Sequence, residues 1–505
     1  MTLGAKWCKI YRVMCAHNQL STHILIQRVR LYMTHKKKDL HGVKSLIRGV
    51  EGILEIAVLT LLYYQFWRHN YPEGTFPAYY GLGKYVLSGV YGLLAVVLLL
   101  NFEGFKFGYL KTTDVLISQW IAILIANFIT YWQLCLIANV MITPVPMLLL
   151  TAMDFSVCLV CSYIYSHIYH LLYVPKNMLM IYGREDAVVL KFKMDARQDK
   201  YRVTKLIHES AGVDAICREI GNYDAVILTD ITAENRNDIL KYCYQNEVRT
   251  YVAPKLSDII FNGGRDITLF DTPLRLVKGR GLTLMQRLYK RIVDIVVSLV
   301  AMIVASPFML LTAIAIKLED GGPVFYKQKR ATIGGKAFDI LKFRSMIVDA
   351  EKEGKSIPAT QGDPRITKVG RIIRATRIDE LPQILNILKG DMSIVGPRPE
   401  RLEHVEEYSR ELPEFAYRLK VKGGLTGYAQ IYGKYNTSAY DKLRLDLMYI
   451  ENYSLLLDIK LILMTIRIML KKDSTEGFDK AEELEAMKNR ILTEMEDDAM
   501  VGSGK

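Results

Sequence analysis

Four long apolar runs occupy the first third of the 505-residue chain, and they constrain its fold more than any other feature. A helix needs about 20 apolar residues to cross a bilayer core of ~30 Å. The mean hydropathy is only +0.12, and 24% of all residues are charged, so a membrane section must be joined to soluble sections. We therefore predict a membrane α-helical bundle over residues 51–174, built from the runs 53–67, 85–100, 115–140 and 147–173.

The charge that precedes these runs predicts their orientation. Residues 1–50 carry ten Lys or Arg residues and a single acid, Asp39. Loops rich in Lys and Arg stay in the cytoplasm when a membrane protein inserts. Residues 1–50 are therefore predicted to be a basic cytoplasmic segment, and four crossings would return the chain to the cytoplasm near residue 174.

Net charge and cysteine spacing exclude several classes of protein. A formal charge of +13 suits an anionic membrane face, phosphate-bearing substrates or nucleic acid. No zinc-finger spacing or aromatic RNA-binding signature accompanies the charge, so we expect no nucleic acid partner. The close pair Cys158 and Cys161 lies in an apolar run without a second pair of ligands. These cysteines are predicted to face the core or lipid rather than a zinc ion.

Residues 175–277 alternate short apolar strands with helical segments. Such alternation is typical of a parallel α/β sheet, and we predict a Rossmann-like domain. The first strand ends at Gly183, where charged residues replace the further glycines of a dinucleotide-binding turn, so no nucleotide is expected there. The predicted strands cover 178–182, 201–207, 225–229 and 249–253, and the predicted helices cover 186–194, 214–219 and 234–245.

A fifth apolar segment, residues 292–316, is interrupted by Ser306 and Pro307. Proline removes a helical hydrogen bond and clashes with the preceding turn. Basic residues flank the segment on both sides, and both flanks favour the cytoplasm. A re-entrant helix that enters and leaves the same leaflet satisfies both flanks, although a kinked spanning helix has the same apolar pattern. The flanking charge favours the re-entrant form.

Two adjacent acids, Asp379 and Glu380, lie in a stretch crowded with arginines. One carboxylate could attack phosphorus or hold a metal while the arginines neutralise the phosphate. The pair could equally be the start of a helix, because acids and a following proline favour that position. Further along, a glycine-rich loop covers 423–431, an amphipathic helix is predicted over 440–470, and residues 473–505 form a charged tail without an assigned role.

From residue 290 to 470 the chain resembles the bacterial sugar transferase family, the monotopic polyprenyl-phosphate phosphoglycosyl transferases. The preceding regions resemble the long-form members that initiate capsule, exopolysaccharide or O-antigen repeat units. The resemblance implies a mixed α/β catalytic domain over 284–472 with a re-entrant membrane helix at 290–317. It is carried by Ser306-Pro307, Gly322-Pro-Val-Phe, Gln328-x-Arg330, Lys342-Phe-Arg-Ser-Met, Arg377-x-Asp-Glu-Leu-Pro-Gln, Gly396-Pro-Arg-Pro and Gly424-Leu-Thr-Gly-x-Ala-Gln.

The resemblance also implies a mechanism and its residues. Asp379 would attack the β-phosphorus of a UDP-sugar and expel UMP, and polyprenyl phosphate would then accept the sugar phosphate from that aspartate. Glu380, with Asp379 nearby, would hold the cofactor Mg²⁺ or assist activation. The implied phosphate or headgroup contacts are Arg398, Pro397, Arg377, Gln328, Arg330, Lys342 and Arg344.

The expected partners are a UDP-sugar donor, a polyprenyl (undecaprenyl) phosphate acceptor and the lipid of a bacterial inner membrane, with the catalytic domain on its cytoplasmic face. The N-terminal domains could mediate a homodimer. Two other functions stay open on the residues alone: a membrane glycosyltransferase that releases UDP, and a non-catalytic membrane sensor. The identity of the sugar depends on pocket geometry rather than on a motif.

Overall fold

A computed structural model describes residues 46–47, 49–70, 81–172, 175–184, 187–277, 279, 281–348, 350, 363–433 and 437–469. The chain divides into two compact units, Met1–Tyr173 and Val174–Lys505. The predictions for the basic residues 1–45 and for the charged tail 473–505 lie outside the described residues.

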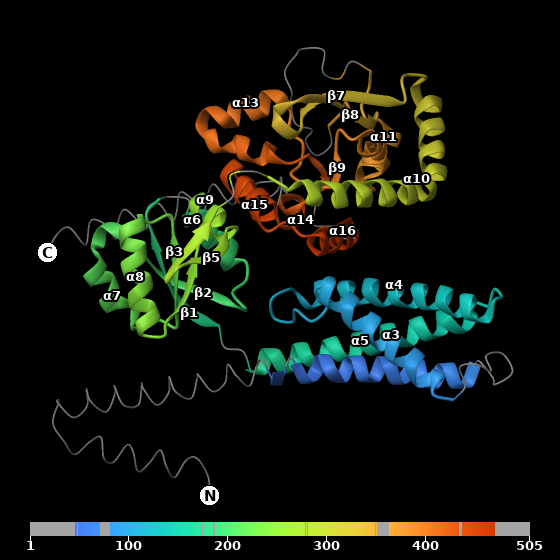
Figure 1. Cartoon of the computed structure of the whole chain (residues 1–505), viewed down its shortest axis with the longest axis horizontal. Coiled ribbons are helices and arrows are strands. Elements are labelled where there is room, and N and C mark those ends of the chain that lie inside the picture. Colours follow the sequence, from blue (N-terminus) through green and yellow to red (C-terminus); the bar gives the residue numbers. More distant parts are fainter. Residues whose placement is uncertain are drawn as a thin grey trace, which may run out of the picture. The chain divides into compact units, whose positions relative to one another are not determined.

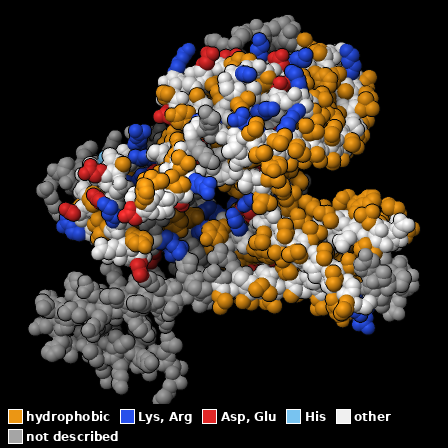
Figure 2. All heavy atoms as spheres, viewed as in Figure 1, with side chains coloured by type: hydrophobic (Ala, Val, Ile, Leu, Met, Phe, Trp, Pro, Cys, Tyr) orange, Lys and Arg blue, Asp and Glu red, His pale blue; other side chains and the backbone are white. Residues whose placement is uncertain are grey.

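The first unit consists of long apolar helices, as predicted. Its described helices are Gly49–Asn70, α3 (Gly83–Asn101), α4 (Thr112–Ala138) and α5 (Val145–Leu172), and all four are long and apolar enough to cross a membrane. Hydrophobic side chains cover most of the visible surface of this unit (Figure 2). Several large apolar side chains, such as Phe128 and Leu136, are exposed and therefore available to lipid.

Three polar side chains inside the first unit, Glu55, Gln119 and Ser162, are paired with one another. Gln119 donates to the carboxylate of Glu55 at 2.8 and 3.1 Å, and Ser162 donates to Gln119 at 2.7 Å. Both Glu55 and Gln119 are fully buried. Such pairing stabilises the unit, because an unsatisfied polar group in an apolar medium costs several kcal/mol.

The second unit begins with a parallel α/β sheet, which confirms the predicted class of that region. Four parallel strands lie in the order β2-β1-β3-β4 (Figure 1). An antiparallel hairpin that the sequence did not predict follows them. The elements are β1 (Lys176–Tyr182), α6 (Ala187–Asp195), β2 (Tyr201–His208), α7 (Val213–Ile220), β3 (Ala225–Thr229), α8 (Ala233–Gln245), β4 (Arg249–Val252), α9 (Leu256–Asn262), β5 (Arg265–Leu269) and β6 (Thr272–Leu276).

Helix α10 (Leu284–Asp320) follows the hairpin and contains the fifth apolar segment. It begins at a capping box, in which Thr283 accepts from the backbone of Gln286, and it contains Pro307. The helix turns sharply near its middle (Figure 1). Ser306 donates to the carbonyl of Ile303 at 2.9 Å. This hydroxyl satisfies a carbonyl near the proline, where the helical hydrogen-bond pattern is disturbed.

Both ends of α10 contact the domain formed by the elements that follow it in sequence. Near its start, Arg291 donates to the carbonyls of Ile387 and Leu388 at 2.6 Å each. At its end, Glu319 accepts from the backbone N–H of Lys368 at 2.7 Å. A straight helix of 37 residues would be about 55 Å long, at ~1.5 Å per residue. The bend near Pro307 therefore allows both ends to reach one domain.

The remaining elements form a small mixed α/β domain around an apolar core, with a smaller cluster of Ile316, Phe343 and Ile373 beside the end of α10. Strands β7 and β8 form an antiparallel pair, and β9 and β10 form a parallel pair. The core includes Ile387, Phe415, Leu443 and Leu447. The elements are β7 (Phe325–Ala331), β8 (Ala337–Phe343), α11 (Lys368–Ala375), η4 (Ile378–Glu380), α12 (Gln383–Lys389), β9 (Ser393–Val395), α13 (Leu402–Glu411), η5 (Pro413–Lys420), β10 (Gly424–Thr426), α14 (Tyr428–Tyr432), α15 (Ala439–Glu451) and α16 (Leu455–Met469).

The prediction of one amphipathic helix over 440–470 is wrong, because the structure divides this stretch into α15 and α16. Helix α15 ends at Glu451, and the side chain of Asn452 bonds back to the carbonyl of Met448 at 2.9 Å. The hydroxyl of Ser454 then accepts from the backbone N–H of Leu457 at 3.1 Å and caps the next helix. Polar caps of this kind satisfy helix-end groups that have no intrahelical partner.

Candidate active site

The acidic pair lies on η4, a short 3-10 helix of one turn that comes just before helix α12. Arg377 precedes the turn in a left-handed conformation, with φ of 60°. The backbone N–H of Glu380 donates to the carbonyl of Arg377 at 3.2 Å, and Pro382 precedes the first residue of α12. The helix-start explanation of the pair is thus correct as local structure, but it does not account for the contacts of the side chains.

Glu380 forms ion pairs with two cationic side chains. Lys342 on β8 donates to Oε1 of Glu380 at 3.3 Å, and Nη2 of Arg398 donates to the same oxygen at 3.0 Å. Burial alone would raise the pKa of Glu380, but the charges of Arg398 and Lys342 hold it far below its usual range. Glu380 is therefore ionised and fixed in place.

Asp379 is in a different state. No side chain in the described part of the chain donates a hydrogen bond to its carboxylate or forms an ion pair with it. Burial raises the pKa of Asp379 above its usual value, Glu380 adds to the rise, and Lys342 opposes it. A half-buried carboxylate without a hydrogen-bond or ion-pair partner is suited to nucleophilic attack, because no ion pair has to be broken first.

The contact between β8 and α12 explains why Lys342 reaches the acid pair. Asn386 of α12 accepts from the backbone N–H of Leu341 at 2.9 Å and donates to the carbonyl of Asp339 at 2.8 Å. Asn386 is buried. One amide side chain therefore joins the strand that carries Lys342 to the helix that follows Glu380.

Arg398 and Pro397 lie on the loop after β9. The carbonyl of Pro397 accepts from the backbone N–H of Gly424 at 2.9 Å, so the predicted glycine-rich loop supports this loop by its backbone. There is no room for a side chain at Gly424, since a Cβ would lie 2.1 Å from the nitrogen of Gly396. The Gly396–Pro399 motif and the glycine-rich loop are thus packed backbone to backbone.

The other predicted contacts are more distant from the acid pair. Gln328 accepts from Arg330 at 2.6 and 3.1 Å, and Arg330 donates to the carbonyl of Pro399 at 3.1 Å. Burial, together with the nearby charge of Arg398, lowers the pKa of Arg330 to about 10. Gln328 and Arg330 therefore support the Arg398 loop, rather than pairing with the acids.

Arg344 pairs with Asp320 at the end of α10. Its guanidinium also fills the space that a side chain at Gly322 would need. Arg377 is exposed beside the pair, and its charge lowers the pKa of both Asp379 and Glu380. The structure therefore places Lys342, Arg377 and Arg398 at the acids, and Arg344 at the base of the membrane helix.

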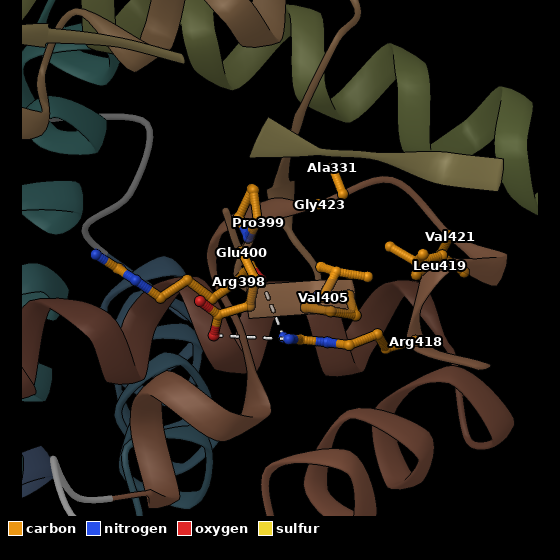
Figure 3. Close-up of a pocket in the computed structure, with 10 residues that line it drawn as sticks. Ala331, Arg398, Pro399, Glu400, Val405, Arg418, Leu419, Val421 and Gly423 are labelled. Atoms are coloured by element: carbon orange, nitrogen blue, oxygen red, sulfur yellow. Dashed lines mark hydrogen bonds and ion pairs between the residues drawn. The ribbon is translucent and has the colours of Figure 1, made fainter. Parts of the chain in front are cut away.

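Three further charged residues lie under the Arg398 loop: Glu400, Arg418 and Asp446. Glu400 directly follows the Gly396–Pro399 motif, so the sequence did offer a signal for it. Arg418 and Asp446 belong to η5 and α15 and carry no motif. Figure 3 shows Arg418 directed toward Glu400 and the backbone of Arg398.

The acid pair could hold a magnesium ion only if a substrate supplied further ligands. Among the described residues, no group of three or more His, Cys, Asp or Glu side chains could hold a metal by itself. Mg²⁺ usually binds one or two carboxylates together with substrate phosphates and water. Both cations on Glu380 contact Oε1, so its Oε2 could contact a metal ion, with the carboxylate of Asp379 nearby.

The family model for bacterial sugar transferases matches residues 285–472. A UDP-N-acetylgalactosamine-undecaprenyl-phosphate N-acetylgalactosaminephosphotransferase of Aeromonas hydrophila is 46% identical over 184 residues, which are 36% of this chain and 43% of the relative. A UDP-glucose:undecaprenyl-phosphate glucose-1-phosphate transferase of Klebsiella pneumoniae is 36% identical over 272 residues, 52% of this chain and 57% of the relative.

A protein of Caulobacter vibrioides with the same name as the Klebsiella relative is 43% identical over 193 residues. The match covers 37% of this chain and 72% of that relative. The chain thus spans about half the length of the first two relatives and most of the third. Family model and relatives agree on the region that carries the acid pair, and the chain belongs to the bacterial sugar transferase family.

Proposed function

We propose that the protein transfers a sugar 1-phosphate from a UDP-sugar to polyprenyl (undecaprenyl) phosphate, releasing UMP and forming a polyprenyl-diphospho-sugar. The observation that carries this proposal is the unequal state of two adjacent carboxylates. Glu380 is ion-paired to Lys342 and Arg398, whereas Asp379 has a raised pKa and a carboxylate without a partner among the described residues. The names of the relatives, which describe sugar phosphate transfer to undecaprenyl phosphate, support the same reaction class.

The reaction proceeds by two displacements at one phosphorus. An oxygen of the ionised Asp379 carboxylate forms a bond to the β-phosphorus of the UDP-sugar, and the bond from that phosphorus to the bridging oxygen breaks. UMP leaves with the electron pair. An oxygen of polyprenyl phosphate then attacks the same phosphorus, and the bond to Asp379 breaks, which restores the carboxylate.

Lys342 and Arg398 supply the positive charge for these steps. Both are already held beside the acid pair by Glu380, at 3.3 and 3.0 Å, so they need no rearrangement when an anionic substrate arrives. Arg398 can bind phosphate through two parallel N–H groups. Oε2 of Glu380, with Asp379 nearby, would hold Mg²⁺, which supplies further neutralisation of the diphosphate when bound.

We also propose that α10 is re-entrant and that the acid pair lies at the cytoplasmic face of a bacterial inner membrane. The support is the bend near Pro307 together with the attachment of both helix ends to one domain, by Arg291 at the start and Glu319 at the end. A spanning helix would separate these ends by a bilayer. The re-entrant form brings the lipid phosphate and a soluble UDP-sugar to the same surface.

The α/β domain is proposed to be Rossmann-like without a bound nucleotide. Its strand order β2-β1-β3-β4 places a topological switch point between β1 and β3, where such domains bind ligands. A Cβ at Gly183, the residue after β1, would lie 2.6 Å from a carboxylate oxygen of Glu209. Glu209 is held there by Thr232 and Asn235. A fixed negative charge at this turn opposes a diphosphate.

The nucleotide product tests the proposed function. The full chain, reconstituted with undecaprenyl phosphate and Mg²⁺, is incubated with a panel of UDP-sugars, and the released nucleotide is identified. We expect UMP with at least one sugar. Release of UDP would overturn the proposal in favour of direct glycosyl transfer. Absence of both nucleotides with every sugar would favour a non-catalytic membrane sensor.

A further inference from the structure

A buried arginine supports the Arg398 loop from beneath. Arg418 is 3% exposed, and its Nη2 donates to the backbone carbonyl of Arg398 at 2.9 Å. Its Nη1 lies 3.6 Å from Oε1 of Glu400. In Figure 3 the side chain of Arg398 extends away from Arg418, so the two arginines share only the backbone of the loop.

Arg418 is in turn held by helix α15 and by an aromatic ring. Oδ2 of Asp446 lies 2.8 Å from Nη2 of Arg418, and Asp446 is 1% exposed. The guanidinium of Arg418 lies 4.8 Å from the centre of the Phe415 ring. Burial raises the pKa of Asp446 to about 6, and Arg418 opposes the rise. The carboxyl therefore depends on Arg418 for its charge, and Arg418 has contacts on several sides.

Stability alone gives a weak reason for such a cluster. Replacing a buried ion pair by apolar side chains is often neutral or stabilising, because desolvation of both ions is costly. The cluster does, however, fix a backbone atom of Arg398, whose guanidinium donates to Glu380 at 3.0 Å. A continuous set of contacts therefore runs from Asp446 through Arg418 and the Arg398 carbonyl to the acid pair.

We propose that Arg418 and Asp446 are positioning residues that set the place of the Arg398 guanidinium relative to Glu380. This inference rests on the proposed phosphotransfer function, in which Arg398 binds the donor phosphate. Arg418 and Asp446 touch no reacting atom and act only through Arg398. Displacing a catalytic group by about 1 Å can reduce a rate by ~10²-fold.

The test is a double-mutant cycle between Arg418 and Arg398 in the reconstituted full chain. Arg418→Met and Asp446→Asn are each combined with Arg398→Ala, and kcat and KM for UMP release are measured. We expect each single variant to lower kcat/KM by about 10- to 100-fold. In the Arg398→Ala background the further loss should be less than about 2-fold, because the group being positioned is absent. Arg418→Lys, which keeps a cation, should recover part of the loss.

A buried ion pair elsewhere in the same domain provides the matched control. Lys290 and Asp458 lie 2.7 Å apart, are also buried and join α10 to α16. Their side-chain hydrogen bonds among the described residues are to each other and to Tyr449, and not to the Arg398 loop. Asp458→Asn should combine additively with Arg398→Ala. If the Arg418 and Asp446 variants are also additive with Arg398→Ala, the positioning role is overturned and the cluster is only structural.

A binding measurement separates failure of this inference from failure of the proposed function. The affinity for a UDP-sugar is measured by calorimetry on the same variants, after circular dichroism has confirmed that they are folded. If the wild-type chain binds the UDP-sugar but releases no UMP, the proposed phosphotransfer function fails. In that case, equal and non-additive losses of affinity in the Arg418 and Arg398 variants would still support the positioning role. Unchanged affinity and kcat/KM in folded Arg418→Met and Asp446→Asn would overturn it.

Discussion

Arg398 donates to Oε1 of Glu380 at 3.0 Å, across 18 residues of sequence. This ion pair joins the loop after β9 to the turn before α12, and it occupies one of two adjacent carboxylates. The neighbouring Asp379 carboxylate keeps no such partner among the described residues. In the proposed reaction, the cation that binds phosphate and the nucleophile are thereby held next to each other without forming an ion pair.

Asp379→Asn should abolish turnover, because an amide cannot replace the attacking carboxylate. Loss of a covalent nucleophile costs at least ~10³-fold in kcat. The measurement is UMP release, together with the intact mass of the protein after incubation with a UDP-sugar and no lipid acceptor. The wild-type chain should gain one sugar phosphate, and the variant should gain none. Glu403→Gln, at an exposed position on α13, is the control and should retain activity. Full turnover by Asp379→Asn would disprove the covalent route.

Lys342→Gln should move the acid limb of the pH–rate profile to higher pH. Burial raises the pKa of Asp379, and Lys342 opposes the rise. The attacking form is ionised, so activity is retained above this pKa and is lost as the pH falls through it. Replacing Lys342 removes the opposing charge, so the pKa of Asp379 rises further. The profile of kcat/KM is compared with that of Lys336→Gln, an exposed control. A shift to lower pH would contradict the role of Lys342.

Removal of Mg²⁺ with a chelator should stop UMP release, and added Mg²⁺ should restore it. Glu380→Gln should raise the Mg²⁺ concentration for half-maximal rate by about 10-fold or more, because a carboxylate ligand is lost. The measurement is a Mg²⁺ titration of the initial rate. If Glu380→Gln needs the same Mg²⁺ concentration as the wild type, Glu380 is not a metal ligand and serves only to hold Lys342 and Arg398.

Arg291→Ala should destabilise the catalytic domain at the base of the membrane helix. Its guanidinium makes two hydrogen bonds of 2.6 Å to carbonyls at the end of α12. Losing them should cost about 2–3 kcal/mol in the free energy of unfolding. Thermal unfolding in detergent should then show a Tm lower by about 5 °C. Arg287→Ala, which removes a single bond to Leu282, serves as the comparison and should have a smaller effect. Equal Tm values for wild type and Arg291→Ala would contradict this anchoring.

Cysteine labelling tests the re-entrant helix. Single cysteines are placed before and after α10, by Thr268→Cys and Lys336→Cys, in a chain whose seven native cysteines have been replaced. An impermeant thiol reagent added to intact cells should label neither position, and both should react after lysis. Labelling of one position but not the other in intact cells would establish a spanning helix instead.

The sequence by itself determined the apolar helices, the parallel α/β region and the position of the acid pair. These features depend on local patterns. Apolar length decides whether a helix can cross a bilayer, and alternation of strands and helices decides the sheet class. The Asp379-Glu380 motif and the Ser306-Pro307 break could therefore be identified without knowing what packs against them. The division of residues 440–470 was missed, because its caps, Asn452 and Ser454, are common polar residues within an otherwise helical pattern.

Only the tertiary structure decided how the two acids differ. Lys342 and Arg398 are 38 and 18 residues from Glu380, and nothing in their spacing shows that both contact the same oxygen. Arg418 and Asp446 are without any motif, yet packing of η5 against α15 buries them beneath the Arg398 loop. The charge state of a carboxylate depends on burial and on charges within a few ångströms. Such distances exist only once the elements have packed. Two adjacent acids that look equivalent in sequence therefore differ in the fold, where Glu380 forms two ion pairs and Asp379 forms none among the described residues.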